Sequence, residues 1–288
     1  MSRPIALVTD STASLPLELV EKRGIIVVPL RVVIGAKSYD EGPHGGATPK
    51  TVADALREFT PVSTSRPTPA AMLEAYEAAV SGGASEIVSI HLSGEMSGTY
   101  ESAQLASREA SVPVTVVDTK LLGMATGFAV LTAADVLDAG GSRSDAAAAA
   151  SRRAEAMTSL FYVDTLEYLR RGGRIGAAAA LLGSALSVKP LLKLENGRVG
   201  MLEKVRTAAR ALSRLEELAV TAAGDEPVDV AVAHLANPER AGLLADNLRI
   251  RLASNLADRE IAVGEVGAVI GAHVGPGMVA VVVAPLLR

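Results

Sequence analysis

The sequence predicts an α/β protein in which a parallel sheet covered by helices is followed by a mixed sheet. Short apolar runs alternate with helical patterns from the start to about Met157, as in sheets that helices cover on both faces. Thr48 and Thr68 are each followed by proline, a pairing that favours the start of a helix. Farther along, Asn196-Gly197 lies between two apolar runs and predicts a hairpin, which brings an antiparallel pair into the second half.

The elements expected before Met157 alternate between strand and helix, and glycine pairs end several of the helices. This order predicts an N-terminal three-layer α/β/α domain with a parallel sheet over residues 1–157. The expected strands are Ile5–Thr9, Ile25–Val33, Glu86–His91 and Val114–Val117. The expected helices are Pro16–Arg23, one opening at Thr48-Pro49, one from Thr68-Pro69 to Gly82-Gly83, Gly98–Ala110, Gly123–Asp138 and Ser144–Met157.

After Met157 the pattern changes, and we expect a C-terminal α/β domain with a mixed sheet over residues 158–288. The expected strands are Leu160–Val163, Val188–Leu194, Val199–Val205, Val228–His234, Val266–Ile270 and Met278–Val283. The expected helices are Thr165–Arg171, Thr207–Ala223 and Pro238–Ala253.

The composition argues against several classes of function. The net charge is −4 and the basic residues are scattered, so neither nucleic acid nor an anionic membrane is expected as a partner. The chain has no cysteine, which rules out disulfides and thiolate metal sites. The apolar run Ile5–Val8 is too short for a signal sequence, and no later stretch reaches about 18 apolar residues. We therefore expect a cytoplasmic protein with no integral membrane association.

Two loops rich in hydroxyl groups follow expected elements of the first half. One is Val62–Thr68 and the other is His91–Tyr100, which follows a clear strand and opens a helix. Ligands of open parallel sheets bind beyond the carboxyl ends of the strands, and hydroxyls with helix N-terminal N–H groups suit an oxyanion. The plainer interpretation is that these Ser and Thr residues cap helices, and the residues alone leave both interpretations open.

A third candidate segment is Gly271–Gly277, which contains His273. His273 is expected at the end of an apolar strand, directly before Pro276-Gly277, the favoured central pair of a type II turn. A lone histidine there is more often structural than functional. Its role depends on whether it meets the two hydroxyl-rich loops in space.

Standard enzyme and metal signatures are incomplete. The chain has no phosphate-binding Gly-x-x-x-x-Gly-Lys-Ser/Thr sequence and no Gly-x-Gly-x-x-Gly that opens a helix after a strand. Gly94–Gly98 has one residue too many between its first glycine and Ser97 for a nucleophile elbow. The histidines lack the spacing of metal ligands, so no metal site is expected. They are His44, His91, His234 and His273.

With these segments in view, the sequence resembles the DegV family over essentially the whole chain. Individually the shared motifs are weak, but they occur in the family's order. They are Val8–Thr12, Val28–Leu30, Thr64–Thr68, Ser97–Tyr100, Leu166–Leu169 with Gly172–Ile175, Lys189-Pro190, and His273 with Gly275–Gly277.

The resemblance implies a specific role, because DegV proteins are fatty-acid-binding subunits of bacterial fatty acid kinase. By this resemblance the acyl chain is buried between the two domains, and Thr64, Ser97 and His273 hydrogen-bond its carboxylate. Arg206 matches a family arginine that engages the ATP-dependent kinase partner, which makes the acyl phosphate. The chain itself is then not an enzyme and needs no cofactor beyond its bound long-chain fatty acid. Further residues expected near the head group are Ser65, Ser93 and Gly98.

Two departures from the family pattern add charge near the expected head group. Arg66 stands where the family often has Gln, and Gly94-Glu95 replaces a common Ser-Gly pair. Either changes the affinity for the head group, or the two pair with each other. Two other functions stay open: a serine acyl hydrolase with Ser97 as nucleophile and His273 as base, and a lipid sensor or storage protein without a kinase partner. The sequence does not specify the acyl chain or the oligomeric state.

Overall fold

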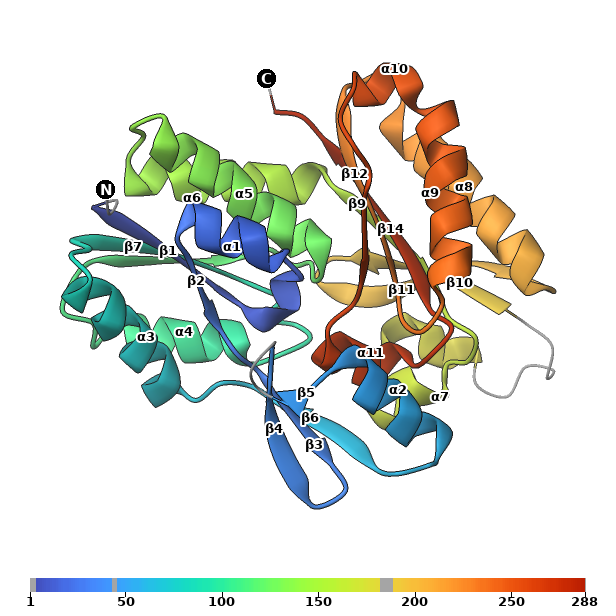
Figure 1. Ribbon diagram of the computed structural model, residues 1–288, viewed down its shortest axis with the longest axis horizontal. Helices are drawn as coiled ribbons and strands as arrows, with labels where there is room; N and C mark the ends of the chain where they lie inside the picture. The colour runs from blue at the N-terminus through green and yellow to red at the C-terminus, as the bar shows by residue number, and fades with distance from the viewer. Residues whose placement is uncertain (1–3, 43–45, 182–188, 288) are drawn as a thin grey trace.

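A computed structural model describes residues 4–42, 46–181 and 189–287. Within these residues the strands form three sheets, which we call A, B and C (Figure 1). Sheet A is parallel and has the strand order β2-β1-β7-β8, so the expected parallel sheet of the N-terminal half is confirmed. Its strands are β1 (Ile5–Asp10), β2 (Ile25–Val28), β7 (Glu86–His91) and β8 (Val114–Asp118).

Helices cover both faces of sheet A, which gives the expected three layers (Figure 1). On one face Val8 and Ile87 pack against α3 and α4, and on the other Leu7 and Val88 pack against α5 and α6. Neighbouring residues of a strand therefore serve opposite faces, as the pleat requires. The helices of this half are α1 (Leu17–Arg23), α2 (Pro49–Arg57), α3 (Pro69–Ser81), α4 (Thr99–Ser107), α5 (Met124–Asp138) and α6 (Arg143–Ala156), with a 3₁₀ turn, η1 (Ser11–Ala13), after β1.

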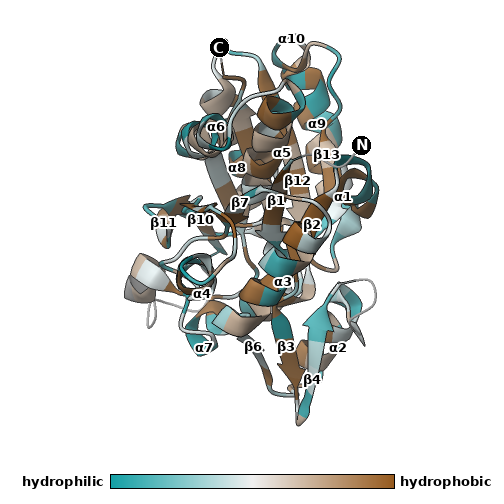
Figure 2. Ribbon diagram, turned by 90° about the vertical axis from the view of Figure 1, so that its left-hand side faces the viewer, coloured by the Kyte–Doolittle hydropathy of each residue, from teal (hydrophilic) through white to brown (hydrophobic). Residues whose placement is uncertain are grey.

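Sheet B was not expected from the sequence. The expected strand Ile25–Val33 is wrong as a single element, because the chain leaves sheet A after β2 and enters sheet B at β3. Pro29 lies at this point and has no N–H to continue a ladder. Part of the expected loop Val62–Thr68 is also a strand, in which Thr64 pairs with Val32. The strands are β3 (Arg31–Ile34), β4 (Lys37–Glu41), β5 (Gly46–Ala47) and β6 (Val62–Ser65), and β4 is largely hydrophilic (Figure 2).

Sheet C is mixed, as expected, with the order β11-β10-β9-β14-β12-β13. The hairpin between β10 and β11 is confirmed: Asn196 and Gly197 have φ angles of 51° and 80°, as a type I′ turn requires. Val188, the expected start of β10, lies outside the described residues. The strands are β9 (Thr158–Tyr162), β10 (Lys189–Glu195), β11 (Arg198–Val205), β12 (Val228–His234), β13 (Ala262–Glu265) and β14 (Val279–Pro285).

Helices α8 and α9 pack on one face of sheet C through a core that includes Tyr162, Val230 and Val281. The opposite face turns toward the N-terminal half. The remaining helices of this part are α7 (Glu167–Arg171), α8 (Ala208–Ala223), α9 (Pro238–Arg251) and α10 (Ala253–Leu256), with a 3₁₀ segment, η2 (Gly176–Leu181).

The expected strand Val266–Ile270 is wrong, because most of it lies in a helix, α11 (Ala268–Val274). His273 is therefore in the last turn of a helix and not at the end of a strand. A short apolar run fits either element by periodicity. The helix is favoured by a long-range contact, in which the N–H of Val269 donates to the buried Glu41 carboxylate at 2.8 Å. That contact satisfies one of the N–H groups that a helix start leaves unpaired.

The strands of sheets A and B all precede Met157, and those of sheet C all follow it. The division into residues 1–157 and 158–288 stays a prediction, because the two parts share a core. Ala231, Val282 and Ala284 of sheet C pack in one buried cluster with α5 and α6. Among the described residues no helix is long and apolar enough to cross a membrane.

Candidate functional site

A cavity of about 440 Å³ lies where sheet C faces the N-terminal half of the chain. This volume is within the range typical of small-molecule sites. Sheet C lines it with apolar side chains such as Phe161, Ala280 and Val282, and α11 adds Ile270 and Val274. The N-terminal half adds apolar residues from the loops that follow β7 and β8 and from the start of α5, which are Leu92, Met96, Leu122 and Met124.

The structure brings the three predicted head-group residues to this one cavity. Thr64 comes from β6, Ser97 from the loop between β7 and α4, and His273 from α11, and all three line it. Thr64 Oγ1 lies 2.8 Å from His273 Nε2, and Ser97 Oγ lies 2.8 Å from Thr99 Oγ1. Ser97 lies beyond the carboxyl end of β7, where the sequence predicts a ligand-binding loop. Thr64 instead reaches the cavity from sheet B.

The three further residues expected near the head group do not all reach the cavity. Ser65 and Gly98 line the cavity, whereas Ser93 is not among its lining residues. Ser93 is fully buried, and its hydroxyl donates to the carbonyl of Gly197 at 2.7 Å. It therefore ties the loop after β7 to the turn of the β10–β11 hairpin.

His273 is neutral at pH 7. Burial, and then the positive charge of Arg174, lower the pKa of its imidazole to about 4. Its Nδ1 is buried and has no hydrogen-bond partner among the described residues. An unpaired N–H is costlier to bury than a bare ring nitrogen, so we assign the proton to Nε2, which then donates to Thr64 Oγ1. This leaves the hydrogen of the Thr64 hydroxyl free to donate into the cavity.

Glycines hold the His273 ring in place. A Cβ at Gly172 would lie 2.1 Å from His273 Nδ1, so only glycine permits the end of α7 to approach the ring. At Gly275 the φ angle is +75°, and a Cβ there would lie 2.0 Å from the Tyr168 ring. The glycines of both sequence motifs therefore serve the packing of α7 against α11.

Two arginines line the same cavity. Arg66 Nη1 donates to the carbonyl of Gly98 at 3.1 Å and to Glu101 at 2.7 Å. Arg174 Nε donates to the carbonyl of Met96 at 3.1 Å. Sequence reasoning gave Arg174 no role, although it follows the Gly172-Gly173 motif, because nothing local indicates that it faces the site.

The two charges that depart from the family pattern do not pair with each other. Glu95 accepts from Arg198 Nε at 2.8 Å, whereas Arg66 pairs with Glu101. Arg66 therefore adds a positive charge to the lining, partly offset by Glu101, and Glu95 contributes to the contact between its loop and β11.

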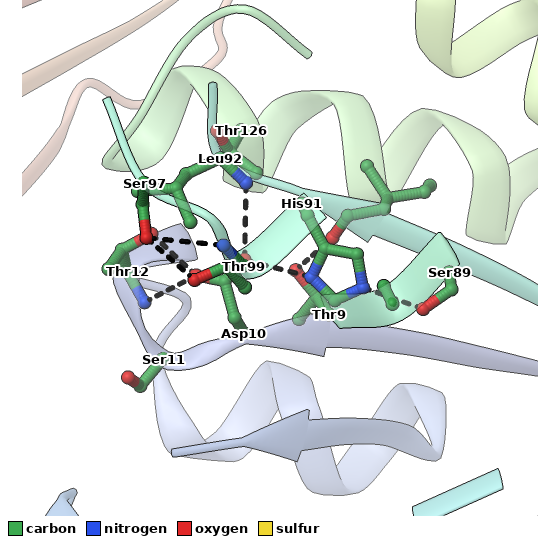
Figure 3. Close-up of polar contacts among 12 residues, drawn as sticks. Thr9, Asp10, Ser11, Thr12, Ser89, His91, Leu92, Ser97, Thr99 and Thr126 are labelled. Carbon is green, nitrogen blue, oxygen red and sulfur yellow. Dashed lines mark hydrogen bonds and ion pairs between the residues drawn. The ribbon is translucent and has the colours of Figure 1, made fainter. Parts of the chain in front are cut away.

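Beside the cavity, Figure 3 shows a buried polar network around Asp10. Asp10 Oδ2 lies 2.9 Å from His91 Nδ1, and His91 Nε2 lies 2.7 Å from Ser89 Oγ. Asp10 Oδ1 accepts from the N–H and hydroxyl of Thr12, which lines the cavity. The network thus fixes one part of the cavity wall to the carboxyl ends of β1 and β7.

The Ser89–His91–Asp10 hydrogen bonds have the order of a catalytic triad. All three side chains are fully buried, however, and none lines the cavity, so no substrate reaches Ser89. His273, in contrast, reaches the cavity, but no described residue hydrogen-bonds its Nδ1, the atom that the carboxylate of a triad would orient. Neither histidine has the geometry of an acyl hydrolase.

No group of three or more His, Cys, Asp or Glu among the described residues could hold a metal ion. His44 lies outside the described residues.

Arg206 lies at a separate depression near the end of β11, which Glu203, Lys204, Arg210 and Arg214 also line. Arg206, Lys204 and Arg210 are exposed, and none of them forms an ion pair with a described residue. Glu203 is engaged by Arg214 at 2.8 Å. The depression is therefore an exposed basic surface, which we call the Arg206 surface (Lys204, Arg206 and Arg210).

The fold and the cavity define a class: an α/β protein with a largely apolar cavity that is polar at one end. Residues 4–286 match the family model described as "Uncharacterised protein, DegV family", and the chain belongs to the DegV family. A DegV domain-containing protein of Streptomyces coelicolor is 56% identical over 283 residues, covering 98% of this chain and 99% of that protein. One from Deinococcus radiodurans is 38% identical over 284 residues, covering 98% and 99%.

Solved structures agree with this assignment. One, described as fatty acid binding of a DegV family protein from Thermus thermophilus, is 35% identical with a TM-score of 0.91, and the match covers 99% of this chain and 100% of that one. Another, described as DegV, a fatty acid binding protein from Bacillus subtilis, is 32% identical with a TM-score of 0.89 and the same coverage.

Proposed function

We propose that this protein binds a long-chain fatty acid in the cavity and presents its carboxylate to a partner kinase. The observation that carries the proposal is the meeting of Thr64, Ser97 and His273 at one apolar cavity. The two similar structures from Thermus thermophilus and Bacillus subtilis, both described as fatty-acid-binding, support it. In this proposal residues 1–157 and 158–288 are two domains with the acyl chain held between them.

The head group is recognised by donors that do not depend on a protonated histidine. Since His273 Nε2 donates to Thr64, the Thr64 hydroxyl donates to a carboxylate oxygen. We assign the donor of the Ser97–Thr99 hydrogen bond to Thr99 Oγ1, which leaves the hydrogen of the Ser97 hydroxyl available to the carboxylate. A buried carboxylate without such partners would be costly. The positive charges of the Arg66 and Arg174 guanidinium groups stabilise a negative charge in the cavity, so they favour the ionised carboxylate form of the ligand.

The tail supplies most of the affinity. A chain with about 14 methylenes gains roughly 11 kcal/mol on burial, at about 0.8 kcal/mol for each. Association and ordering costs reduce this gain. The apolar wall formed by sheet C and α11 suits such a tail, and the polar end then selects acids and orients the carboxylate.

In this proposal a second protein transfers the phosphoryl group from ATP to the carboxylate. We propose an ATP-dependent fatty acid kinase that docks at the Arg206 surface and forms the acyl phosphate. The exposed basic groups favour an acidic partner surface. Because such a partner uses ATP, we propose that the complex works in the cytoplasm and that its acyl phosphate enters phospholipid metabolism.

Mass spectrometry of the purified protein tests the binding step. We expect organic extracts to contain a long-chain fatty acid, and the delipidated protein to take one up in a saturable manner. If no acyl species is extracted and none is taken up, the proposal is wrong. If the protein binds a fatty acid, a test for acyl-phosphate formation with the kinase and ATP distinguishes presentation to a kinase from lipid storage or sensing. The hydrolase alternative predicts a burst of product from an activated ester that Ser97→Ala abolishes.

A further inference from the structure

The wall that sheet C contributes to the cavity is apolar except at Ser159. Of the described residues that β9 to β14 contribute to the lining, Ser159 alone is polar. It is 7% exposed, and no hydrogen bond joins its hydroxyl to another described residue. Because Ser159 lines the cavity, a ligand that covers its hydroxyl without a hydrogen bond costs free energy, and an alanine or valine at this position would avoid that cost.

Ser159 lies away from the polar end of the cavity. It pairs with Val282 of β14, which in turn pairs with Ala231 of β12, and both of these line the cavity. Met278 lies next to the turn after α11, and Val282 follows it by four positions, about 13 Å along an extended chain. Ser159 therefore lies farther along sheet C from α11 than Ala280 does, and in the proposed binding mode its hydroxyl faces the tail of the fatty acid.

We propose that Ser159 hydrogen-bonds an oxygen part-way along the bound acyl chain, so that the site prefers a hydroxy or oxo fatty acid. This inference rests on the proposed fatty-acid binding and names its ligand class. A plain saturated chain would leave the hydroxyl unpaired. A hydroxy or oxo group on the chain would give the Ser159 hydroxyl a hydrogen-bond partner.

A positional series of hydroxyhexadecanoic acids tests the inference against hexadecanoic acid. Competition with a fluorescent fatty acid should show that the wild-type protein prefers one mid-chain isomer by roughly three- to tenfold, which is about 0.7 to 1.4 kcal/mol. Ser159→Ala should bind hexadecanoic acid at least as well and lose the preference. Ser159→Thr should keep it, because it retains the oxygen.

A relocated hydroxyl provides the matched control. Ala280 lines the cavity in the neighbouring row, opposite Phe161 and nearer to α11. In Ser159→Ala/Ala280→Ser the preferred hydroxyl position should shift toward the carboxylate. Equal affinity of the wild type for all the acids, or a preference that Ser159→Ala leaves unchanged, would overturn the inference while fatty-acid binding stands. If no acid binds to any of these proteins, the proposed function itself fails.

Discussion

Thr64 Oγ1 and His273 Nε2 are 2.8 Å apart although 209 residues separate them in the chain. The contact joins the edge of sheet B to the last turn of α11, so it closes the polar end of the cavity and orients both side chains. It also sets the direction of the hydrogen bond, since the neutral imidazole donates and the Thr64 hydroxyl is left to donate to a ligand.

Removing the Thr64 hydroxyl should therefore weaken ligand binding. Thr64→Val keeps the shape of the side chain and its place in β6 but deletes the donor to the carboxylate. We expect an affinity loss of about 10- to 100-fold, the effect of losing a hydrogen bond to a charged group. Displacement of a fluorescent fatty acid measures it. Ser63→Ala is the control, because Ser63 is the exposed neighbour in β6 and does not line the cavity. Equal effects of the two changes would contradict the assigned role.

Stability of the delipidated protein should depend on pH through His273. Its pKa is about 4 in the folded chain against 6.5 for the free side chain. The unfolded chain then binds more protons between these values, so the free energy of unfolding rises with pH across this window and falls as the pH drops toward 4. His273→Gln should remove up to about 3 kcal/mol of this dependence. Urea midpoints at about pH 7 and about pH 4.5 measure it. Parallel pH profiles of the two proteins would argue against an enclosed neutral imidazole.

Glu41 should change the free energy of unfolding with pH in the opposite direction to His273. Burial raises the pKa of its carboxyl, which accepts from Val269 N and from the Ser11 hydroxyl. A raised folded pKa contributes stability at low pH that is lost as the pH rises through that value. Compared with wild type, Glu41→Gln should therefore show a smaller loss of stability from about pH 4 to about pH 7. The same urea titrations measure the difference. A steeper loss in the variant would mean that the carboxylate, not the acid, stabilises α11.

Gly172 should tolerate no side chain. A Cβ there would overlap His273 Nδ1 at 2.1 Å, so Gly172→Ala must displace either the ring or the end of α7. We expect a loss of about 1 to 3 kcal/mol in the free energy of unfolding and weaker fatty-acid binding. Gly242→Ala is the matched control, since a Cβ at that position of α9 has no atom within 4 Å. It should stabilise by about 0.5 to 1 kcal/mol. Denaturant unfolding of both variants gives the comparison.

The sequence predicted elements best where local signals and burial agree. β7 and β12 have the expected bounds, because each is a strongly apolar run between clear breaks. The Asn196-Gly197 hairpin followed from the positive φ angles that these residues tolerate. The α11 helix was missed because its N-terminus depends on Glu41, more than 200 residues away in the chain.

The site was predictable in part for a similar reason. The family motifs identified Thr64, Ser97 and His273, and the structure brings them to one cavity. Arg174 and Ser159 carry no local signal, because their importance lies in which face of a fold they occupy. Only the register of sheet C reveals that Ser159 faces the cavity beside Val282.

The Arg206 surface should separate ligand binding from presentation. Arg206 is exposed and does not line the acyl cavity, so Arg206→Ala should leave fatty-acid affinity within about twofold of wild type. If the surface docks a kinase, the same change removes a charge from the interface and should lower acyl-phosphate formation by about tenfold, mainly through weaker association of the two proteins. Raising the ionic strength should reduce the difference in acyl-phosphate formation between the wild type and Arg206→Ala, since salt screens exposed charges.

Arg249→Ala is the control, because Arg249 is exposed on α9 and pairs locally, with Asp246. If Arg206→Ala impairs fatty-acid binding as much as phosphorylation, or if Arg249→Ala has the same effect, then the surface is not the docking site.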